Sequence, residues 1–126
     1  MKYIFLFFIS LLTILTLQYN QNISTNKHDN REMLRDYFLY ACINHGFKEF
    51  HLVEKDHSGA VYLELLKYDL EALNKVDSLA KTFVQSIPVS NYENKKTKGI
   101  IILSIREYNS KKVKSFIKSL DRYMID

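Results

Sequence analysis

The sequence is poor in the residues that interrupt regular structure. Its 126 residues include three glycines, one proline, one cysteine and no tryptophan. An all-β fold needs many tight turns, so this scarcity argues against one and favours helices joined by short loops. The lone Cys42 excludes an internal disulfide, which leaves either a small buried hydrophobic residue or an intermolecular pairing.

The N-terminus predicts export. Lys2 is followed by an uncharged apolar run over residues 3–17, which has the length of a signal-peptide core and is short for a membrane span. No A-x-A cleavage motif is present, so an uncleaved signal anchor stays open as a rival interpretation. We expect a signal peptide over residues 1–20, a polar linker over 21–30 and one folded domain over 31–126. That domain would lie outside the cytoplasm, with no stable membrane span after cleavage.

Hydrophobic periodicity predicts an all-α fold, a compact bundle of about five helices after the signal peptide. The expected helices cover residues 31–44, 55–67 and 69–87, a segment that begins with the apolar run 100–105, and residues 110–124. The run 100–105 could also be a buried strand, but it has no convincing partner strand, which favours a helix. Asn30, Asp69 and Ser110 are expected to cap helix N-termini. Gly46 is expected to end the first helix in a left-handed conformation, and Pro88 to stop the third.

Each expected helix carries an apolar face, which we expect to point inward. Gly59, near the start of the second helix, would also let another backbone approach closely. The expected inward residues are Leu34, Tyr37, Phe38 and Ala41; Val61, Tyr62, Leu65 and Leu66; Leu73, Val76, Ala80, Phe83 and Ile87; Ile101, Ile105 and Tyr108; and Val113, Phe116, Ile117, Leu120, Tyr123 and Met124.

No arrangement of residues indicates catalysis, and we expect no enzyme. Cys42 lies mid-helix beside an apolar face, where an inert thiol is more plausible than a nucleophile paired with a histidine. His45, His51, Asp56 and His57 match no standard zinc spacing. The sequence contains no phosphate-binding glycine loop and no H-E-x-x-H or G-x-S-x-G motif. The sequence therefore predicts neither a cofactor nor a metal site.

Charge is distributed unevenly along the chain, whose net charge is +4. Acidic residues gather between positions 49 and 77, and basic residues between 95 and 122. This asymmetry could attract a membrane surface or another anionic partner, or it could reflect solvated helix faces alone. Nucleic acid is disfavoured by the export signal, and because the aromatic residues of the last helix belong to its inward stripe.

Five short stretches, taken in order, resemble the amidase-immunity proteins of type VI secretion systems. They are residues 36–43, residues 56–62, residues 68–72 leading to Leu79 and Ala80, residues 92–95 and residues 105–111. Each stretch alone is weakly specific, but their order and spacing cover nearly all of the expected mature chain.

The resemblance implies a compact helical bundle that reaches the periplasm and dimerises there. Such a protein would bind a cognate peptidoglycan amidase delivered by neighbouring cells and block its groove with a helix and a protruding loop. Members of the family commonly carry a second cysteine before the last helix, where this chain has Ser104. A disulfide to Cys42 is therefore impossible here.

The polar stretch 89–99 has the character of such a loop. Tyr92 would be its aromatic anchor, unless the ring packs back onto the domain, and the polar contacts would come from Asn91, Glu93, Asn94 and Lys95. A second contact surface would comprise Asp56, Ser58 and Tyr62. The competing interpretation gives Asp56 or Ser58 the role of a helix cap and places Tyr62 in the core.

Overall fold

The computed structural model describes residues 26–92 and 95–125. The chain divides into two units, Met1–Asn30 and Arg31–Asp126. The predicted signal peptide and residues 21–25 of the predicted linker lie outside the described residues, so the division into signal peptide, linker and domain stays a prediction. In the part of the chain that is described, no helix is both long enough and apolar enough to cross a membrane.

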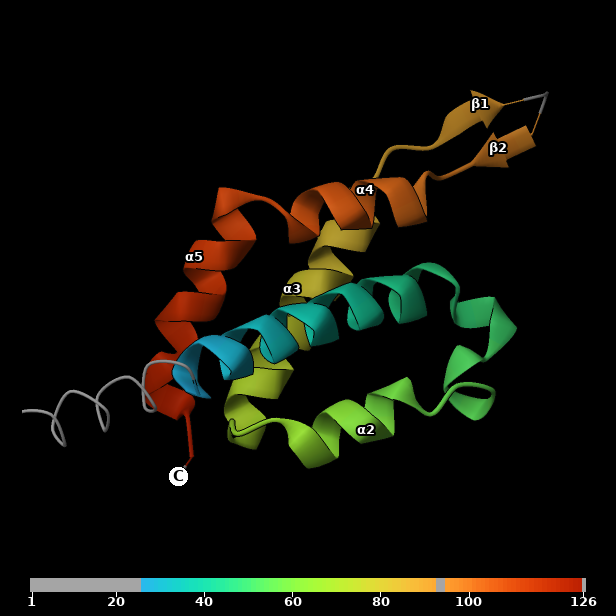
Figure 1. Cartoon of the computed structure of the whole chain (residues 1–126). Coiled ribbons are helices and arrows are strands. Elements are labelled where there is room, and N and C mark those ends of the chain that lie inside the picture. The colour runs from blue at the N-terminus through green and yellow to red at the C-terminus, as the bar shows by residue number, and fades with distance from the viewer. Residues whose placement is uncertain (1–25, 93–94, 126) are drawn as a thin grey trace, which may run out of the picture. The chain divides into compact units, whose positions relative to one another are not determined.

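The second unit is built mainly from helices (Figure 1). Its first helix, residues 31–46, is here called the central helix. The elements that follow are the 3-10 helices η1 (Lys48–Phe50) and η2 (Leu52–Glu54), the helices α2 (Ser58–Leu65) and α3 (Leu70–Ser86), the strands β1 (Ser90–Tyr92) and β2 (Lys95–Thr97), the helices α4 (Ile100–Tyr108) and α5 (Lys111–Ser119), and the 3-10 helix η3 (Leu120–Tyr123).

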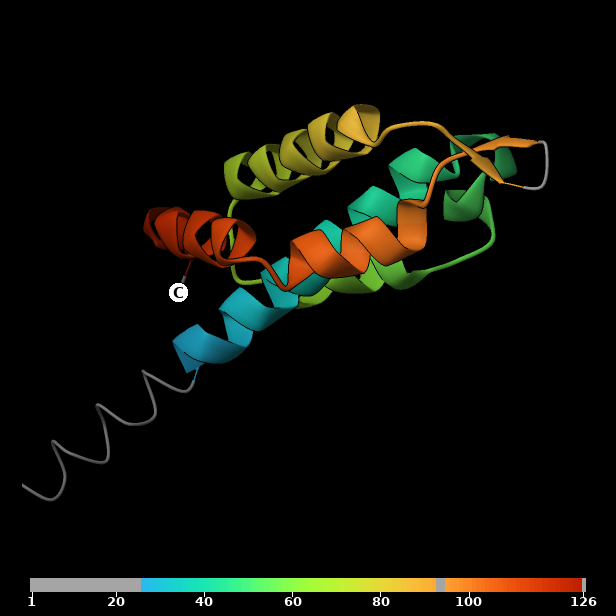
Figure 2. The same ribbon diagram turned by 90° about the horizontal axis from the view of Figure 1, so that it is seen from above.

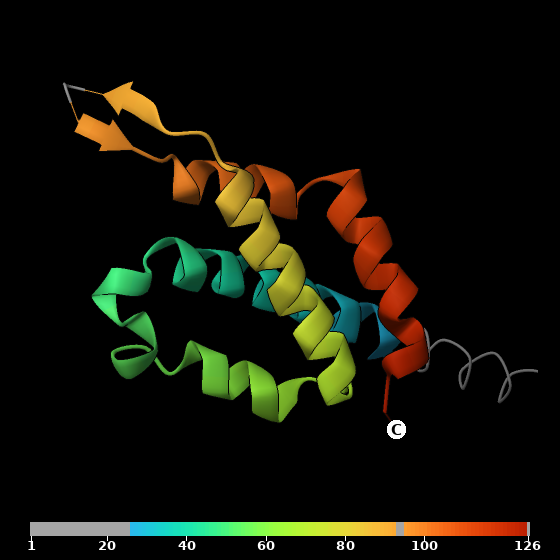
Figure 3. The same cartoon turned by 180° about the vertical axis from the view of Figure 1, so that it is seen from behind.

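The other helices pack around the central helix. In Figures 1 and 3, α2 runs back beside it in the opposite direction and α3 crosses it. The central-helix side chains Leu34, Phe38 and Cys42 are fully buried. The Phe38 ring faces the Phe83 ring of α3, with 6.4 Å between the ring centroids. The predicted all-α class is therefore confirmed, with one helix forming the middle of the core.

The helices with the clearest sequence patterns form as expected. Asp69 caps α3, since its Oδ1 accepts a hydrogen bond from the backbone N–H of Ala72 at 3.0 Å. Ser110 caps α5 in the same way, because its Oγ accepts from the N–H of Val113 at 3.1 Å. Helix α3 ends at Ser86, two residues before Pro88. The inward faces predicted for these two helices are buried or partly buried.

The two ends predicted for the first helix are wrong. Asn30 is helical rather than a cap, because helix already covers residues 26–30, and its side-chain amide donates to the backbone oxygen of Asn26 at 3.0 Å. Gly46 is also helical, and no described glycine has a positive φ. A Cβ on Gly46 would lie 2.3 Å from Cγ2 of Ile100. The glycine therefore serves the close approach of α4, and the left-handed residue is His51, with φ of 49°.

The inward faces predicted for α2 and α4 are partly wrong. Val61 and Leu65 of α2 are 48% and 54% exposed, because this helix is only eight residues long and lies at the edge of the bundle. In α4, Ile101 and Ile105 are exposed, while Ile100 is buried against Gly46. A continuous apolar run does not specify which of its faces points inward, so packing decides it.

The stretch 89–99, whose polar character predicts a loop, contains a hairpin. Strands β1 and β2 are antiparallel, with Ser90 opposite Thr97, Asn91 opposite Lys96 and Tyr92 opposite Lys95. Strands this short and polar give no alternating hydrophobic pattern, which is the signal that normally reveals a strand. The hairpin extends past the ends of α3 and α4, as Figure 2 shows from above.

The C-terminal residues close the second unit. Tyr68 and Met124 form an isolated antiparallel bridge, with the N–H of Asp69 donating to the Tyr123 oxygen at 2.9 Å and the N–H of Ile125 to the Lys67 oxygen at 3.0 Å. In addition, Nε of Arg31 donates to Asp121 at 2.8 Å. The last turn is thereby fixed both to the start of the central helix and to the connection between α2 and α3.

Candidate partner-binding surface

The β1–β2 hairpin is the most prominent projection of the second unit (Figures 1 and 3). Its base is held by the Ser90 hydroxyl, which donates to the Thr97 carbonyl at 3.3 Å, and by Nζ of Lys98, which donates to the Val84 carbonyl at 3.4 Å. Asn91 is exposed. An ordered hairpin loses less conformational entropy on binding than a flexible loop of the same length.

The structure describes the predicted hairpin contacts only in part. Strand backbone is described for Tyr92 and Lys95, whereas Glu93 and Asn94 lie outside the described residues. The two alternatives for Tyr92, a partner anchor or a plug onto the domain, therefore both stay predictions.

The second predicted contact group is brought together at a cleft of about 430 Å³. Three elements form it, namely the central helix, η2 and the start of α2 with the residues before it. Asp56, Ser58 and Tyr62 all line this cleft, and none of its lining residues belongs to the described part of the hairpin. The lining residues are Asp36, Leu39, Tyr40, Ile43, Asn44, Leu52, Asp56, Ser58 and Tyr62.

Two tyrosine rings form a wall of the cleft. The Tyr40 and Tyr62 centroids are 6.1 Å apart, and a third ring, that of Tyr37, lies 6.2 Å from each of them. Gly59 makes this packing feasible, because a Cβ there would lie 2.5 Å from the Tyr40 hydroxyl oxygen. We expected Gly59 to admit another backbone, but the group that packs against it is the Tyr40 side chain.

The carboxylates of the cleft have local partners. Oδ1 of Asp56 accepts a hydrogen bond from the Ser58 hydroxyl at 2.9 Å and lies 3.4 Å from the Ser58 N–H, at the first turn of α2. Burial, and then the charges of Asp36 and Asp56, raise the pKa of Tyr62. The N-cap residue of α2 is His57, which makes no side-chain cap hydrogen bond, so neither Asp56 nor Ser58 occupies the predicted cap position. Tyr62 is partly buried against the core and also lines the cleft.

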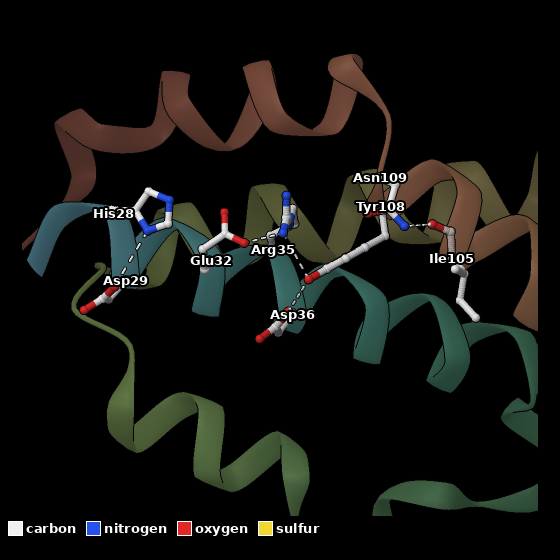
Figure 4. Close-up of polar contacts among 8 residues, drawn as sticks. All are labelled: His28, Asp29, Glu32, Arg35, Asp36, Ile105, Tyr108 and Asn109. Carbon is white, nitrogen blue, oxygen red and sulfur yellow. Dashed lines mark hydrogen bonds and ion pairs between the residues drawn. The ribbon is translucent and has the colours of Figure 1, made fainter. Parts of the chain in front are cut away.

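A polar network behind the cleft fixes the position of Asp36 (Figure 4). The Tyr108 hydroxyl of α4 donates to Oδ1 of Asp36 at 2.7 Å, and Nη2 of Arg35 donates to that hydroxyl at 3.2 Å. The Arg35 guanidinium lies over the Tyr108 ring, 4.3 Å from its centroid, and also pairs with Glu32. Asp36 and Tyr40 were not among the predicted site residues. Their spacing of four residues places them on one helix face, but that spacing is too common to single them out.

Cys42 is enclosed in the core and lies against Ser104 of α4. Burial raises the pKa of its thiol to about 12, although interaction with the Ser104 hydroxyl opposes the shift. That hydroxyl is buried and forms no hydrogen bond of normal geometry with a described residue. A thiol with so high a pKa is a poor nucleophile at neutral pH. Among the described residues, no group of three His, Cys, Asp or Glu side chains is placed to hold a metal ion.

These features define the class of the protein as a small, mainly helical domain whose distinctive elements are a projecting hairpin and an aromatic, acidic cleft. A family model described as Tai4, type VI secretion system amidase immunity protein, matches residues 32–117, which is 86 of the 126 residues. The chain belongs to this family of type VI secretion system amidase immunity proteins. No match is found among curated proteins or among solved structures.

Proposed function

We propose that this protein binds and inhibits a cognate peptidoglycan amidase effector in the periplasm and so protects the cell that produces it. Family membership supports the immunity role. An inhibitor of this kind acts by occupying a surface of the enzyme and needs no catalytic group of its own. The buried, high-pKa thiol of Cys42 agrees with a role that does not depend on turnover.

The hairpin is the element that we propose enters the groove of the amidase. The observation that carries this proposal is its projection beyond the helices on a hydrogen-bonded base (Figure 3). Tyr92 would anchor it, with Asn91, Glu93, Asn94 and Lys95 as polar contacts. Buried aromatic anchors surrounded by polar contacts dominate the binding energy of most protein interfaces.

We also propose that the protein acts as a homodimer. The support is the exposed apolar face of α4, where Ile101, Ile102 and Ile105 are 53%, 56% and 46% exposed. Contiguous exposed apolar side chains commonly mark an interaction surface. Sedimentation of the mature protein, alone and with Ile102→Glu, tests this part separately from inhibition.

The alternative function, an exported basic module that binds a membrane or another anionic surface, is supported by the exposed Lys111, Lys112, Lys114 and Lys118 of α5. The two functions differ in their response to salt. Binding to an anionic surface should weaken steeply as salt rises, whereas a protein interface that rests mainly on uncharged contacts should weaken much less.

Periplasmic co-expression with the product of the adjacent open reading frame tests the proposed function, with cell lysis as the readout. We expect rescue that requires the export signal. Tyr92→Ala should weaken both rescue and the affinity of the purified proteins by about tenfold or more. Lys114→Ala, at an exposed position of α5, is the control. Immunoblots check that the wild type and the variants are present in the periplasm in equal amounts. Rescue without export would contradict the periplasmic site of action, and full rescue by a chain lacking residues 91–96 would contradict the role of the hairpin.

A further inference from the structure

The cleft between the central helix and α2 has a composition that selects its occupant. Its volume of about 430 Å³ falls within the range of small-ligand pockets, about 300–1,000 Å³. We propose that this cleft receives an arginine side chain of the amidase effector, as a second contact separate from the hairpin. The proposal rests on the proposed function and adds to it the chemistry of one partner residue.

The charge of the cleft is the first argument. Asp36 and Asp56 both line it, and neither forms an ion pair with any residue in the described part of the chain. Asp36 accepts from the neutral hydroxyl of Tyr108, and Asp56 accepts from the hydroxyl and the backbone N–H of Ser58. Each carboxylate has several acceptor positions, so these hydrogen bonds leave capacity for a cation.

No lysine or arginine lines this cleft. Lys55 and His57 line a neighbouring cleft, which shares Asp56, Ser58 and Tyr62 with this one. The Arg35 guanidinium pairs with Glu32 and donates to the Tyr108 hydroxyl. The cleft therefore presents two negative charges that are not neutralised from within.

The aromatic wall is the second argument. A guanidinium is planar and weakly hydrated, so it can stack on a tyrosine ring while it donates hydrogen bonds to a carboxylate. Tyr40 and Tyr62 offer ring surface beside the carboxylates, and Leu39, Ile43 and Leu52 offer apolar surface for the methylene stem. The described part of the chain already contains such an arrangement, where Arg35 lies over the Tyr108 ring beside Asp36.

An apolar side chain would suit the cleft less well. It would remove water from the two carboxylates without replacing the lost hydrogen bonds, which is costly. Lysine would satisfy the charge but gains less from stacking and makes no bidentate contact with a carboxylate. Arginine uses both the carboxylates and the rings.

The test uses the full mature chain and the product of the adjacent open reading frame. Asp36→Asn and Asp56→Asn remove the charges but keep an oxygen that can accept from Tyr108 and Ser58. Glu64→Gln is the matched control, since it makes the same change at an exposed position of α2 outside the cleft. We expect each asparagine variant to weaken effector affinity about tenfold at low salt and to reduce the salt dependence of binding, with the control unchanged.

A second arm probes the cleft without the effector. N-acetyl-arginine methylamide should shift the NMR signals of the cleft residues in the wild type but not in the double variant that combines Asp36→Asn with Asp56→Asn. The neutral citrulline analogue should not shift these signals in either protein. Equal effects of the two probes would overturn the cation chemistry. Unchanged effector affinity in the double variant would overturn the role of the cleft while leaving the proposed function intact. An effector that fails to bind the wild type would refute the proposed function itself, a result separable from the probe titration.

Discussion

Ser104→Cys should introduce a disulfide into the core. The Ser104 and Cys42 side chains are in contact, both are fully buried, and they join α4 to the central helix. The substitution removes a buried hydroxyl that has no hydrogen-bond partner among the described residues, so it should not introduce a new unsatisfied group.

The size of the effect follows from the length of the loop that the bond would close. A cross-link between positions 42 and 104 closes a loop of about 60 residues, for which chain entropy gives about 4 kcal/mol of stabilisation. Strain in the native state lowers the gain from most introduced disulfides, so we expect a rise of about 2–4 kcal/mol in the free energy of unfolding. For a domain of this size that corresponds to a rise in Tm of roughly 10–25 °C.

The assay compares urea unfolding of the oxidised and reduced forms of the variant. Because the pKa of Cys42 is raised to about 12 in the folded protein, little thiolate is available there for disulfide exchange. The bond should therefore form during oxidative refolding, when the thiol has its ordinary pKa, and only slowly after folding. Cys42→Ser combined with Ser104→Cys is the control, since it keeps one thiol and one hydroxyl in the pair.

Two results would refute this reasoning. If thiol titration finds two free cysteines after oxidative refolding, the two backbones are too far apart or wrongly oriented for a bond. If the bond forms but the oxidised variant is no more stable than its reduced form, native-state strain cancels the entropic gain.

Two further changes test the packing and the surface electrostatics. Gly46→Ala should lower the free energy of unfolding by about 1–3 kcal/mol, because the new Cβ would lie 2.3 Å from an α4 side-chain atom. Gly99→Ala, where the nearest atom to a new Cβ is 3.3 Å away, should change that free energy by less than about 1 kcal/mol. Equal effects of the two substitutions in thermal unfolding would contradict the close approach at Gly46. Hydrogen bonds from Tyr123 and Lys75 lower the pKa of Glu71, so its carboxylate contributes stability above its unfolded pKa that is lost as pH falls through the folded pKa. Glu71→Gln should therefore make the acid limb of stability against pH shallower in urea denaturation, and an unchanged limb would show that these bonds contribute nothing.

The helices could be predicted wherever local signals and hydrophobic period agreed. Both α3 and α5 begin after a capping side chain and bury a regular stripe, and both formed as expected. The errors arose where a tertiary contact overrode the local signal. Gly46 resembles a helix terminator but is needed for the approach of Ile100. The run 100–105 indicated a helix without indicating its inward face.

The candidate site was harder to predict because its parts come from separate segments. Asp56, Ser58 and Tyr62 were singled out together and do line one cleft. Its other side comes from Asp36 and Tyr40, which precede them by about 20 residues and become neighbours only when η1 and η2 return the chain to the central helix. The hairpin could not be predicted, because its strands are too short and polar to show a period of two.

The closure of the fold by its last residues sets the order in which the domain can be completed. Asp121 meets Arg31, 90 positions earlier, and Ile125 meets Lys67, so a chain still lacking its final turn has the helices but not these two contacts. Contacts between such distant positions form late, since loop closure must precede any gain from them. These two contacts therefore complete the domain only once the C-terminal turn is available.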